Sequence, residues 1–219
     1  VYSRLAPLFR STAQQTFGRY IDLVRKDDSE RRRMVNALTT NHTFFYRERH
    51  HFDHLAQTVR PALLAKVKAG ESVRIWSAGC STGEELYSLM MALLGPDKAD
   101  ARAFLKGDVA ILATDLADHA VAGAKAASYP AESLKDVPRE LTRCWVREEA
   151  GEARIAPEVC AMVRVKRLNL LGPWPMKRPF DVIFCRNVMI YFDQPTKDRL
   201  VTRFADQLIT GGHLYIGHS

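Results

Sequence analysis

The 219-residue sequence lacks several features that would place it in a well-defined class. It has no run of about 18 consecutive apolar residues and no charged-then-apolar leader, which argues against a membrane span and a secretory signal. Its four cysteines show no Cys-x-x-Cys spacing, so buried free thiols in a reducing cytoplasm are expected. No Gly-Lys-Ser/Thr follows its glycines, which excludes a triphosphate-binding P-loop. We therefore expect a cytoplasmic protein without direct membrane insertion.

Acidic residues are scarce at the start of the chain. Residues 1–60 hold 11 Lys/Arg against 6 Asp/Glu, a surplus of five within a net charge of +7. A basic face favours an acidic partner, which leaves nucleic acid, a membrane surface, an acidic protein and no partner at all as alternatives. The chain opens at Val1, and Ser219 follows an apolar run, so we expect both ends to be cuts in a longer chain.

Apolar spacing divides the chain near residue 72. The first part is predicted helical: Val1 to about Arg33, a segment N-capped by Asp28 or Ser29 that runs to about Thr39, and His51–Lys68, with either a kink or a division into two shorter helices because of Pro61. In the second part, predicted strands (Val73–Ala78, Val109–Thr114, Val163–Leu168, Val182–Cys185 and Leu214–Ile216) alternate with predicted helices (Glu84–Leu94, Asp118–Ala127 and Thr196–Ile209). This alternation predicts a parallel, doubly wound α/β sheet, interrupted at Pro138–Val165 by a small insertion.

The turn after the first predicted strand is the candidate ligand site. Gly79 and Gly83 let the backbone approach a ligand, and the carboxyl ends of parallel strands are the default place for one. The turn lacks the third glycine of a dinucleotide fingerprint. Glu84 and Glu85 open the next helix, where a carboxylate would repel a pyrophosphate but tolerate a sulfonium. The charge favours S-adenosylmethionine as the ligand.

An acidic residue follows the second predicted strand. Asp115 lies 36 residues after Gly79, and its carboxylate could accept both hydroxyls of a ribose. This spacing exceeds the roughly 20 residues of a compact unit. The connection between residues 95 and 108 accounts for the excess. A nucleoside-containing ligand therefore fits the first two strands.

Three sequence blocks resemble the chemotaxis receptor glutamate O-methyltransferases, the CheR family. They are Asn41–Glu48 (NHTFFYRE) with His51-Phe52, the turn up to Tyr87-Ser88, and Phe180–Phe192 (FDVIFCRNVMIYF) with Gly211-Gly212 and Gly217-His218-Ser219. The blocks stand in family order from about Leu38 to Ser219. Leu86 replaces a proline that is usual in the family, Phe44-Phe45-Tyr46 shifts the aromatic pattern slightly, and the first ~35 residues match poorly.

The resemblance implies a Rossmann-like S-adenosylmethionine-dependent methyltransferase sheet with a small N-terminal helical domain and a small β insertion. Residues 1–36 would be a partial, receptor-facing helical domain, and residues 37–71 a linker and helix. Residues 72–219 would be the methyltransferase domain, truncated at its C-terminus, with the insertion at about residues 138–165.

The resemblance also implies a role for each site residue. The donor would be held by Asn41, Thr43 and Arg47 from the linker, Gly79 and Glu84 or Glu85 in the turn, Asp115 at the ribose, Asn169 and Leu170 near the adenine, and Arg186 and Asn187 after the fourth strand. Arg47, Arg186 and Tyr191 are the expected catalytic residues: an arginine would steer the acceptor carboxylate, and Tyr191 would face the transferred methyl group. A carboxylate is already ionised at neutral pH, so alignment would be the enzyme's main task. S-adenosyl-L-homocysteine would be the product.

Simpler roles remain open for these residues. Asp115 could cap a helix, Glu84 and Glu85 could favour a helix dipole, Arg47 could pair on the surface, Tyr191 could be a core aromatic and Asn169 could bond backbone. His50 and His54 share a helix face beside His51, but no third ligand and no His-Glu-x-x-His pattern accompany them. We predict no metal site.

The resemblance thus implies a bacterial protein-glutamate O-methyltransferase of chemosensory adaptation. It also implies a partner, the cytoplasmic helical bundle of chemoreceptors, which the basic N-terminal region would bind. In some family members the β insertion grips a receptor's C-terminal peptide, but with no glycine-rich loop beyond Ala150-Gly151 a tether-independent member is expected. The alternatives are a catalytically silent donor-binding signalling module and a nucleic-acid methyltransferase. No nucleic-acid partner is expected, because the chain lacks the Asn/Asp-Pro-Pro-aromatic sequence for amine methylation.

Overall fold

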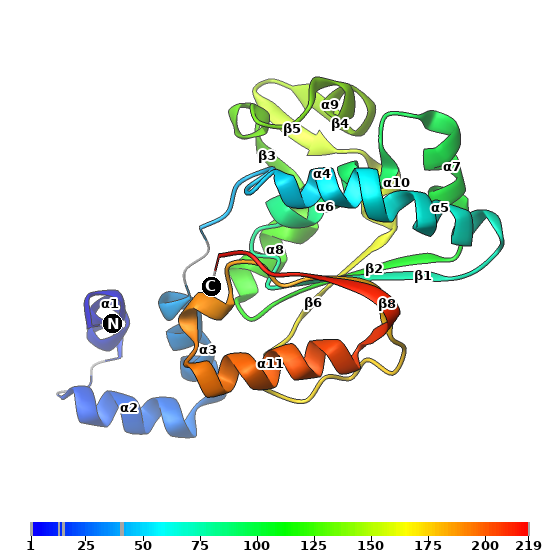
Figure 1. Ribbon diagram of the computed structural model, residues 1–219. Coiled ribbons are helices and arrows are strands. Elements are labelled where there is room, and N and C mark those ends of the chain that lie inside the picture. Colours follow the sequence, from blue (N-terminus) through cyan, green and yellow to red (C-terminus); the bar gives the residue numbers. More distant parts are fainter. Residues whose placement is uncertain (1, 13, 15, 40–41, 219) are drawn as a thin grey trace.

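A five-stranded parallel sheet forms the centre of the computed structural model, which describes residues 2–12, 14, 16–39 and 42–218 (Figure 1). The strands are β1 (Val73–Ala78), β2 (Val109–Asp115), β6 (Val163–Arg167), β7 (Phe180–Phe184) and β8 (Leu208–Tyr215). Their order is β6-β2-β1-β7-β8, and each neighbouring pair is parallel. The predicted α/β fold class is confirmed.

Helices cover both faces of the sheet because the side chains of β1 alternate between two apolar clusters. Val73 and Ile75 face the larger cluster, and Trp76 and Ala78 face the smaller one. The larger cluster includes side chains of α4 (His50–His54), the π-helix η1 (Leu55–Val59), α5 (Arg60–Lys68), α6 (Glu84–Leu94), α7 (Lys98–Lys106) and α8 (Asp118–Ala126). The smaller cluster includes side chains of α11 (Gln194–Asp206). This helix lies on the opposite face of the sheet (Figure 1).

The helical segment before the sheet is divided into two short helices, α4 and α5, by the π-helical turn η1. Pro61 lies in the first turn of α5, directly after η1, and has no N–H to donate to the preceding turn. The predicted irregularity therefore lies in the turn just before Pro61. Arg60, the first residue of α5, reaches the end of α6, where its Nε donates to the Leu93 carbonyl at 2.8 Å.

Two connections differ from the prediction. The segment between α6 and β2, for which no helix was predicted, contains α7, and the backbone N–H groups of Ala99 and Asp100 in its first turn donate to the Asp97 carboxylate. The insertion begins earlier than about residue 138, because β3 (Ser128–Pro130) joins β4 (Val146–Glu149) and β5 (Glu152–Ile155) in the small sheet β3-β5-β4. The short helices η2 (Ala131–Leu134), α9 (Arg139–Trp145) and α10 (Pro157–Ala161) accompany it.

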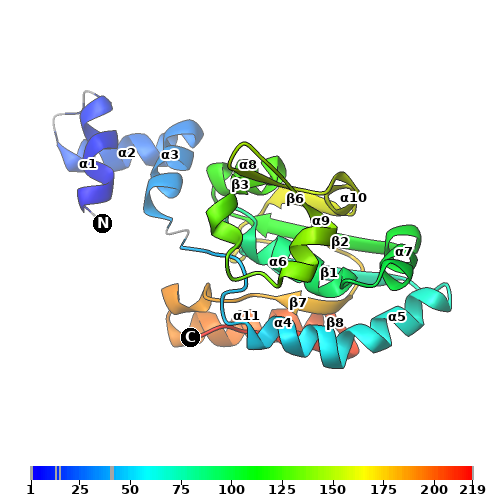
Figure 2. The same ribbon diagram turned by 90° about the horizontal axis from the view of Figure 1, so that it is seen from above.

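Three N-terminal helices lie to one side of the sheet (Figure 2). They are α1 (Tyr2–Ser11), α2 (Phe17–Lys26) and α3 (Asp28–Leu38), so the predicted opening helix is divided, and α3 runs past the expected boundary at residue 36. Asp27, not Asp28 or Ser29, caps α3. Asn36 ties α3 to α8, accepting from the Asp118 backbone N–H at 3.0 Å. None of the helices in the described ranges is long and apolar enough to span a membrane.

Candidate active site

A cavity of about 660 Å³ opens at the carboxyl ends of β1, β2 and β7. The chain runs outward from β1 through β2 to β6 and then returns to β7 on the other side of β1, so the cavity lies where the strand order reverses. Its wall includes Arg47 from the linker, Gly79 after β1, Asp115 at the end of β2, Asn169 after β6 and Asn187 after β7. Val35 and Leu38 of α3 also line it. Segments far apart in the sequence therefore build one site.

The turn after β1 requires glycine at its first position. Gly79 has φ +88°, and a Cβ atom there would lie 2.5 Å from Cγ2 of Val188 in the loop after β7. The backbone N–H groups of Gly79 and Cys80 donate to the Thr114 carbonyl at 2.7 and 2.9 Å. The turn is thus fixed to β2 and closely covered by the loop after β7.

Asp115 is buried at the edge of this turn. Its Oδ2 accepts the Ser81 N–H at 2.9 Å, and its Oδ1 accepts the Ala117 N–H at 3.0 Å. It does not cap α8, since Ala117 is the N-cap residue of that helix. Each carboxylate oxygen keeps a free lone pair, so both can still accept from a ligand hydroxyl. The Ser81 hydroxyl beside it is buried and has no hydrogen-bond partner among the described residues.

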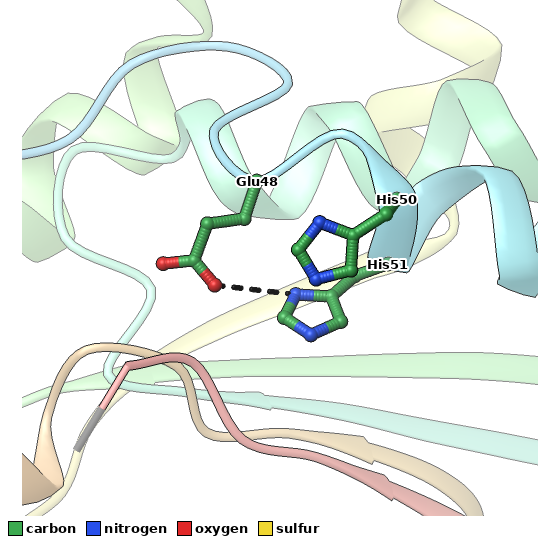
Figure 3. A group of neighbouring side chains, drawn as sticks. All are labelled: Glu48, His50 and His51. Atoms are coloured by element: carbon green, nitrogen blue, oxygen red, sulfur yellow. Dashed lines mark ion pairs between the residues drawn. The ribbon is translucent and has the colours of Figure 1, made fainter.

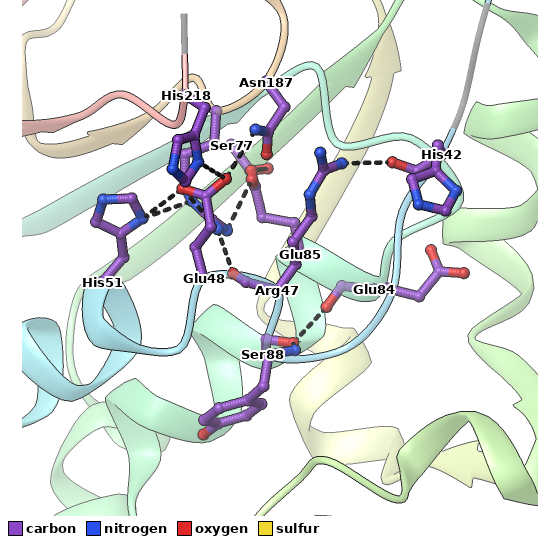
Figure 4. A network of polar contacts seen from close by, with 12 residues as sticks. His42, Arg47, Glu48, His51, Ser77, Glu84, Glu85, Ser88, Asn187 and His218 are labelled. Atoms are coloured by element: carbon purple, nitrogen blue, oxygen red, sulfur yellow. Dashed lines mark hydrogen bonds and ion pairs between the residues drawn. The ribbon is translucent and has the colours of Figure 1, made fainter.

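The two glutamates that open α6 point in different directions. Glu85 lines the cavity and accepts the Ser77 hydroxyl at 2.9 Å, whereas Glu84 is not in the cavity wall and accepts the Thr82 hydroxyl at 2.7 Å (Figure 4). Burial raises the pKa of the Glu85 carboxyl to about 7, although the Arg186 charge and the Ser77 hydroxyl act in the opposite direction. Of the two glutamates, only Glu85 can meet a ligand here.

Arg186 is the centre of a buried polar network behind the cavity (Figure 4). Its Nε donates to Nδ1 of His51 at 2.9 Å, and Nη2 donates to the Arg47 carbonyl. Nη1 lies 3.4 Å from Glu85, and the guanidinium stacks over the Phe52 ring. Although part of Arg186 lines the cavity, its donors face the protein. We interpret it as the residue that holds the linker on the sheet.

Sequence reasoning gave Glu48 no role, yet its carboxylate joins this network. Asn187 Nδ2 donates to its Oε1 at 2.8 Å, and His218 Nδ1 lies 2.9 Å from the same oxygen. Burial alone would raise the pKa of Glu48, but the hydrogen bonds from His218 and Asn187 and the charge of Arg186 lower it to about 2. Burial, together with the Arg186 charge, lowers the pKa of His51 to about 4.

Ligand atoms of Glu48, His50 and His51 lie within 4.8 Å of one another, as metal ligands can (Figure 3). His51 Nδ1, however, already accepts from Arg186 Nε. The Arg186 guanidinium is also 3.7 Å from the Glu48 carboxylate. A metal ion here would add positive charge beside this buried guanidinium, so we interpret Glu48 and His51 as members of the Arg186 network.

The mouth of the cavity is apolar and exposed. Of the five large exposed hydrophobic side chains within the described ranges, four line this cavity: Phe44, Leu171, Ile190 and Tyr191. Tyr191 is 58% exposed, which excludes a core role for it. Arg47 donates from Nη1 to the His42 carbonyl at 2.7 Å, and among the residues that the structure describes it forms no ion pair with an acid. An exposed apolar patch of this kind is typical of a binding site.

The loop after β6 is held by a residue that no motif indicated. Arg203 of α11 donates to the Leu170 and Gly172 carbonyls at 2.7 Å each and stacks 3.9 Å above the centre of the Trp174 ring. The Asn169 side chain accepts the Leu171 N–H, so it bonds the backbone, which was the simpler role considered for it. Asn169, Leu170 and Thr43 line the cavity, while Asn41 lies outside the described residues.

Comparison with known proteins shows similarity to chemotaxis methyltransferases over the whole chain. The family described as CheR methyltransferase, SAM binding domain, matches residues 41–219. A probable chemotaxis protein methyltransferase of Rhizobium etli is 42% identical over 100% of this chain and 82% of its own length. Chemotaxis protein methyltransferase 2 of Pseudomonas aeruginosa is 39% identical (100% and 77%), and the Escherichia coli chemotaxis protein methyltransferase is 38% identical (100% and 75%).

Proposed function

The chain belongs to the CheR methyltransferase family, and from that premise we propose that it transfers the methyl group of S-adenosylmethionine to glutamate side chains of chemoreceptors. It is a methyltransferase with S-adenosylmethionine as its cofactor. The observation that carries the proposal is the cavity itself. Its inner wall offers buried carboxylates to the donor, and its mouth offers an arginine and exposed apolar side chains to a protein acceptor.

The inner wall fits the donor. Both carboxylate oxygens of Asp115 can still accept from ribose hydroxyls. The buried Ser81 hydroxyl has no partner among the described residues, and a bound ligand could provide one. Glu85 provides a carboxylate next to the turn, which suits a cationic sulfonium better than a phosphate. When bound, S-adenosylmethionine supplies an electrophilic methyl group.

The mouth would position the acceptor. Arg47, held by the His42 carbonyl, can orient an incoming carboxylate with a charge-assisted hydrogen bond while leaving one oxygen free to attack. Tyr191 stands on the short helix η3 (Met189–Tyr191) with its ring exposed, where it can contact the acceptor chain. Phe44 and Ile190 would exclude water once that chain is seated. Alignment of this kind can contribute about 7–11 kcal/mol to lowering a barrier.

The acceptor is tested with labelled donor and cytoplasmic fragments of a chemoreceptor. We expect label on fragments that carry glutamates at the exposed positions of the helical bundle. Matched fragments with Glu→Gln replacements should take up none, because an amide oxygen is a poor nucleophile. Equal labelling of the two fragments would exclude glutamate as the acceptor.

Donor affinity should depend on pH through Glu85. Its pKa of about 7 in the free protein means that it is largely protonated below that pH and ionised above it. We therefore expect the preference for S-adenosylmethionine over S-adenosylhomocysteine, which lacks the sulfonium charge, to rise roughly tenfold between about pH 6 and about pH 8. Calorimetric titration with both ligands measures this, and Glu85→Gln should abolish the rise. A pH-independent ratio in the wild type would contradict it.

We propose that the basic N-terminal helices dock on the acidic receptor bundle. Lys26 of α2 and Arg32 of α3 are exposed, and neither forms an ion pair within the described residues. Replacing both with glutamate should weaken fragment binding roughly tenfold at low salt, since long-range charge steering is lost. Donor affinity should stay unchanged. Lys177→Glu with Arg178→Glu, on the connection before β7, is the matched control, and equal weakening by both pairs would contradict the docking site.

A further inference from the structure

Glu48 links three segments that come together behind the donor cavity (Figure 4). It lies in the linker at φ +55°, a left-handed conformation that few non-glycine residues adopt. From there its carboxylate accepts Asn187 Nδ2 of the loop after β7 and faces His218 of the segment after β8. Its side chain is 11% exposed and does not line the cavity. We propose that Glu48 is a positioning residue of the donor site, which fixes Asn187 and keeps the charge of Glu85 available to a cationic ligand.

Asn187 is the cavity residue that Glu48 holds in place. Asn187 also has a left-handed φ, of +56°, and it lines the cavity. A Cβ atom at Gly217 would lie 2.9 Å from the Asn187 backbone nitrogen, so the segment after β8 presses directly on this residue. The 2.8 Å hydrogen bond to Glu48 holds the Asn187 amide on the other side. Loss of that bond would free a wall of the cavity.

Glu48 also affects the charge of Glu85, because both carboxylates face Arg186. The guanidinium faces two carboxylates, with Glu85 Oε2 at 3.4 Å and Glu48 Oε2 at 3.7 Å. His51 accepts from Arg186 Nε and therefore adds no positive charge. Above about pH 7, where Glu85 is ionised, the Arg186 guanidinium thus faces two carboxylates. Glu48 offsets much of the Arg186 charge, and the carboxylate of Glu85, which lines the cavity, keeps a surplus of negative charge.

This balance predicts an effect on ligand choice. S-adenosylmethionine and S-adenosylhomocysteine differ by one methyl group and the positive charge on sulfur. Without the Glu48 charge, Arg186 would neutralise Glu85 alone, and the cavity would lose its preference for the charged ligand. A residue that only braced the fold would affect both ligands equally.

Two substitutions separate charge from geometry. Glu48→Gln retains the shape and an oxygen acceptor for Asn187 but removes the charge. We expect its affinity for S-adenosylmethionine to fall about tenfold, the size of loss seen when a residue that orients a ligand-binding side chain is removed, while S-adenosylhomocysteine is affected several-fold less. Glu48→Asp keeps the charge on a shorter side chain, and both ligands should weaken to the same extent. Glu71→Gln, an exposed glutamate before β1, is the matched control.

Calorimetric titration of the purified protein with each ligand gives the two dissociation constants and their ratio without any acceptor. The inference rests on donor binding at this cavity and not on the identity of the acceptor. Failure of the wild type to bind S-adenosylmethionine would contradict the proposed donor site, whereas failure to methylate receptors would leave this inference unaffected. An unchanged ratio in Glu48→Gln, or a reduced ratio in Glu48→Asp, would overturn the role proposed for Glu48.

Discussion

Replacing Arg186 with methionine is expected to reduce the free energy of unfolding by about 3–5 kcal/mol, because it leaves buried charges without their partner. The side chain of Arg186 is 1% exposed and faces the carboxylates of Glu48 and Glu85, the His51 ring and the Arg47 carbonyl. Methionine fills a similar volume but provides no donor. Urea denaturation followed by circular dichroism measures the change.

The stability lost in Arg186→Met should also increase with pH. Glu85 has a folded-state pKa of about 7, above its ordinary value of 4.5, so its ionisation destabilises the fold as pH rises through that range. Without Arg186 this pKa rises further. The variant should therefore lose less stability at about pH 5 than at about pH 8. Arg102→Met, on the exposed side of α7, should change stability by no more than about 0.5 kcal/mol. If Arg186→Met also changed stability by only about 0.5 kcal/mol, the proposed role of Arg186 as a buried, charge-neutralising residue would be contradicted.

Asp115→Asn is expected to weaken donor binding by about 2–3 kcal/mol, which is roughly 30- to 150-fold. Both carboxylate oxygens accept backbone N–H groups, from Ser81 and Ala117. The NH₂ group of asparagine would oppose one of these donors in either orientation, and it removes an acceptor from the ribose position. Isothermal titration of S-adenosylmethionine reports the loss.

The pattern of the Asp115 loss differs from that predicted for Glu48. Both ligands carry the same ribose, so S-adenosylmethionine and S-adenosylhomocysteine should weaken to the same degree. Asp136→Asn, an exposed acid in the small insertion, is the control and should leave both affinities unchanged. A selective loss of S-adenosylmethionine alone would show that Asp115 responds to the sulfur charge and does not lie at the ribose.

Local patterns predicted the sheet and the turn because their signals lie within short stretches of sequence. Alternating strands and helices gave the doubly wound fold, and Gly79 with the acid at Asp115 located the crevice. The choice between Glu84 and Glu85 stayed open, because successive helix residues differ by about 100° and only the packing of α6 decides which one faces the cavity. Helix α7 was missed because its segment carries loop signals at both ends, Gly-Pro-Asp and Lys-Gly-Asp.

The supporting network could not be predicted from a single sequence. Glu48 acquires its role only where the linker, the loop after β7 and the segment after β8 meet, and residues 48 and 187 are far apart in the chain. Arg203 likewise reads as an ordinary helix arginine until α11 packs beside the loop after β6. Arg186 was expected to meet substrate, yet its donors are directed at the protein. Contacts of this kind depend on tertiary packing and leave no local pattern.

The most direct test of the proposed function is mass spectrometry of receptor peptides after incubation with S-adenosylmethionine and this protein. We predict peptides heavier by one methylene unit, with the added mass located on glutamate side chains and removed by mild alkali, as for a methyl ester. Asp115→Asn, used at the same concentration and below saturating donor, should give far less of the product. Modification on lysine, on arginine or on added nucleic acid, stable to alkali, would contradict the proposed function.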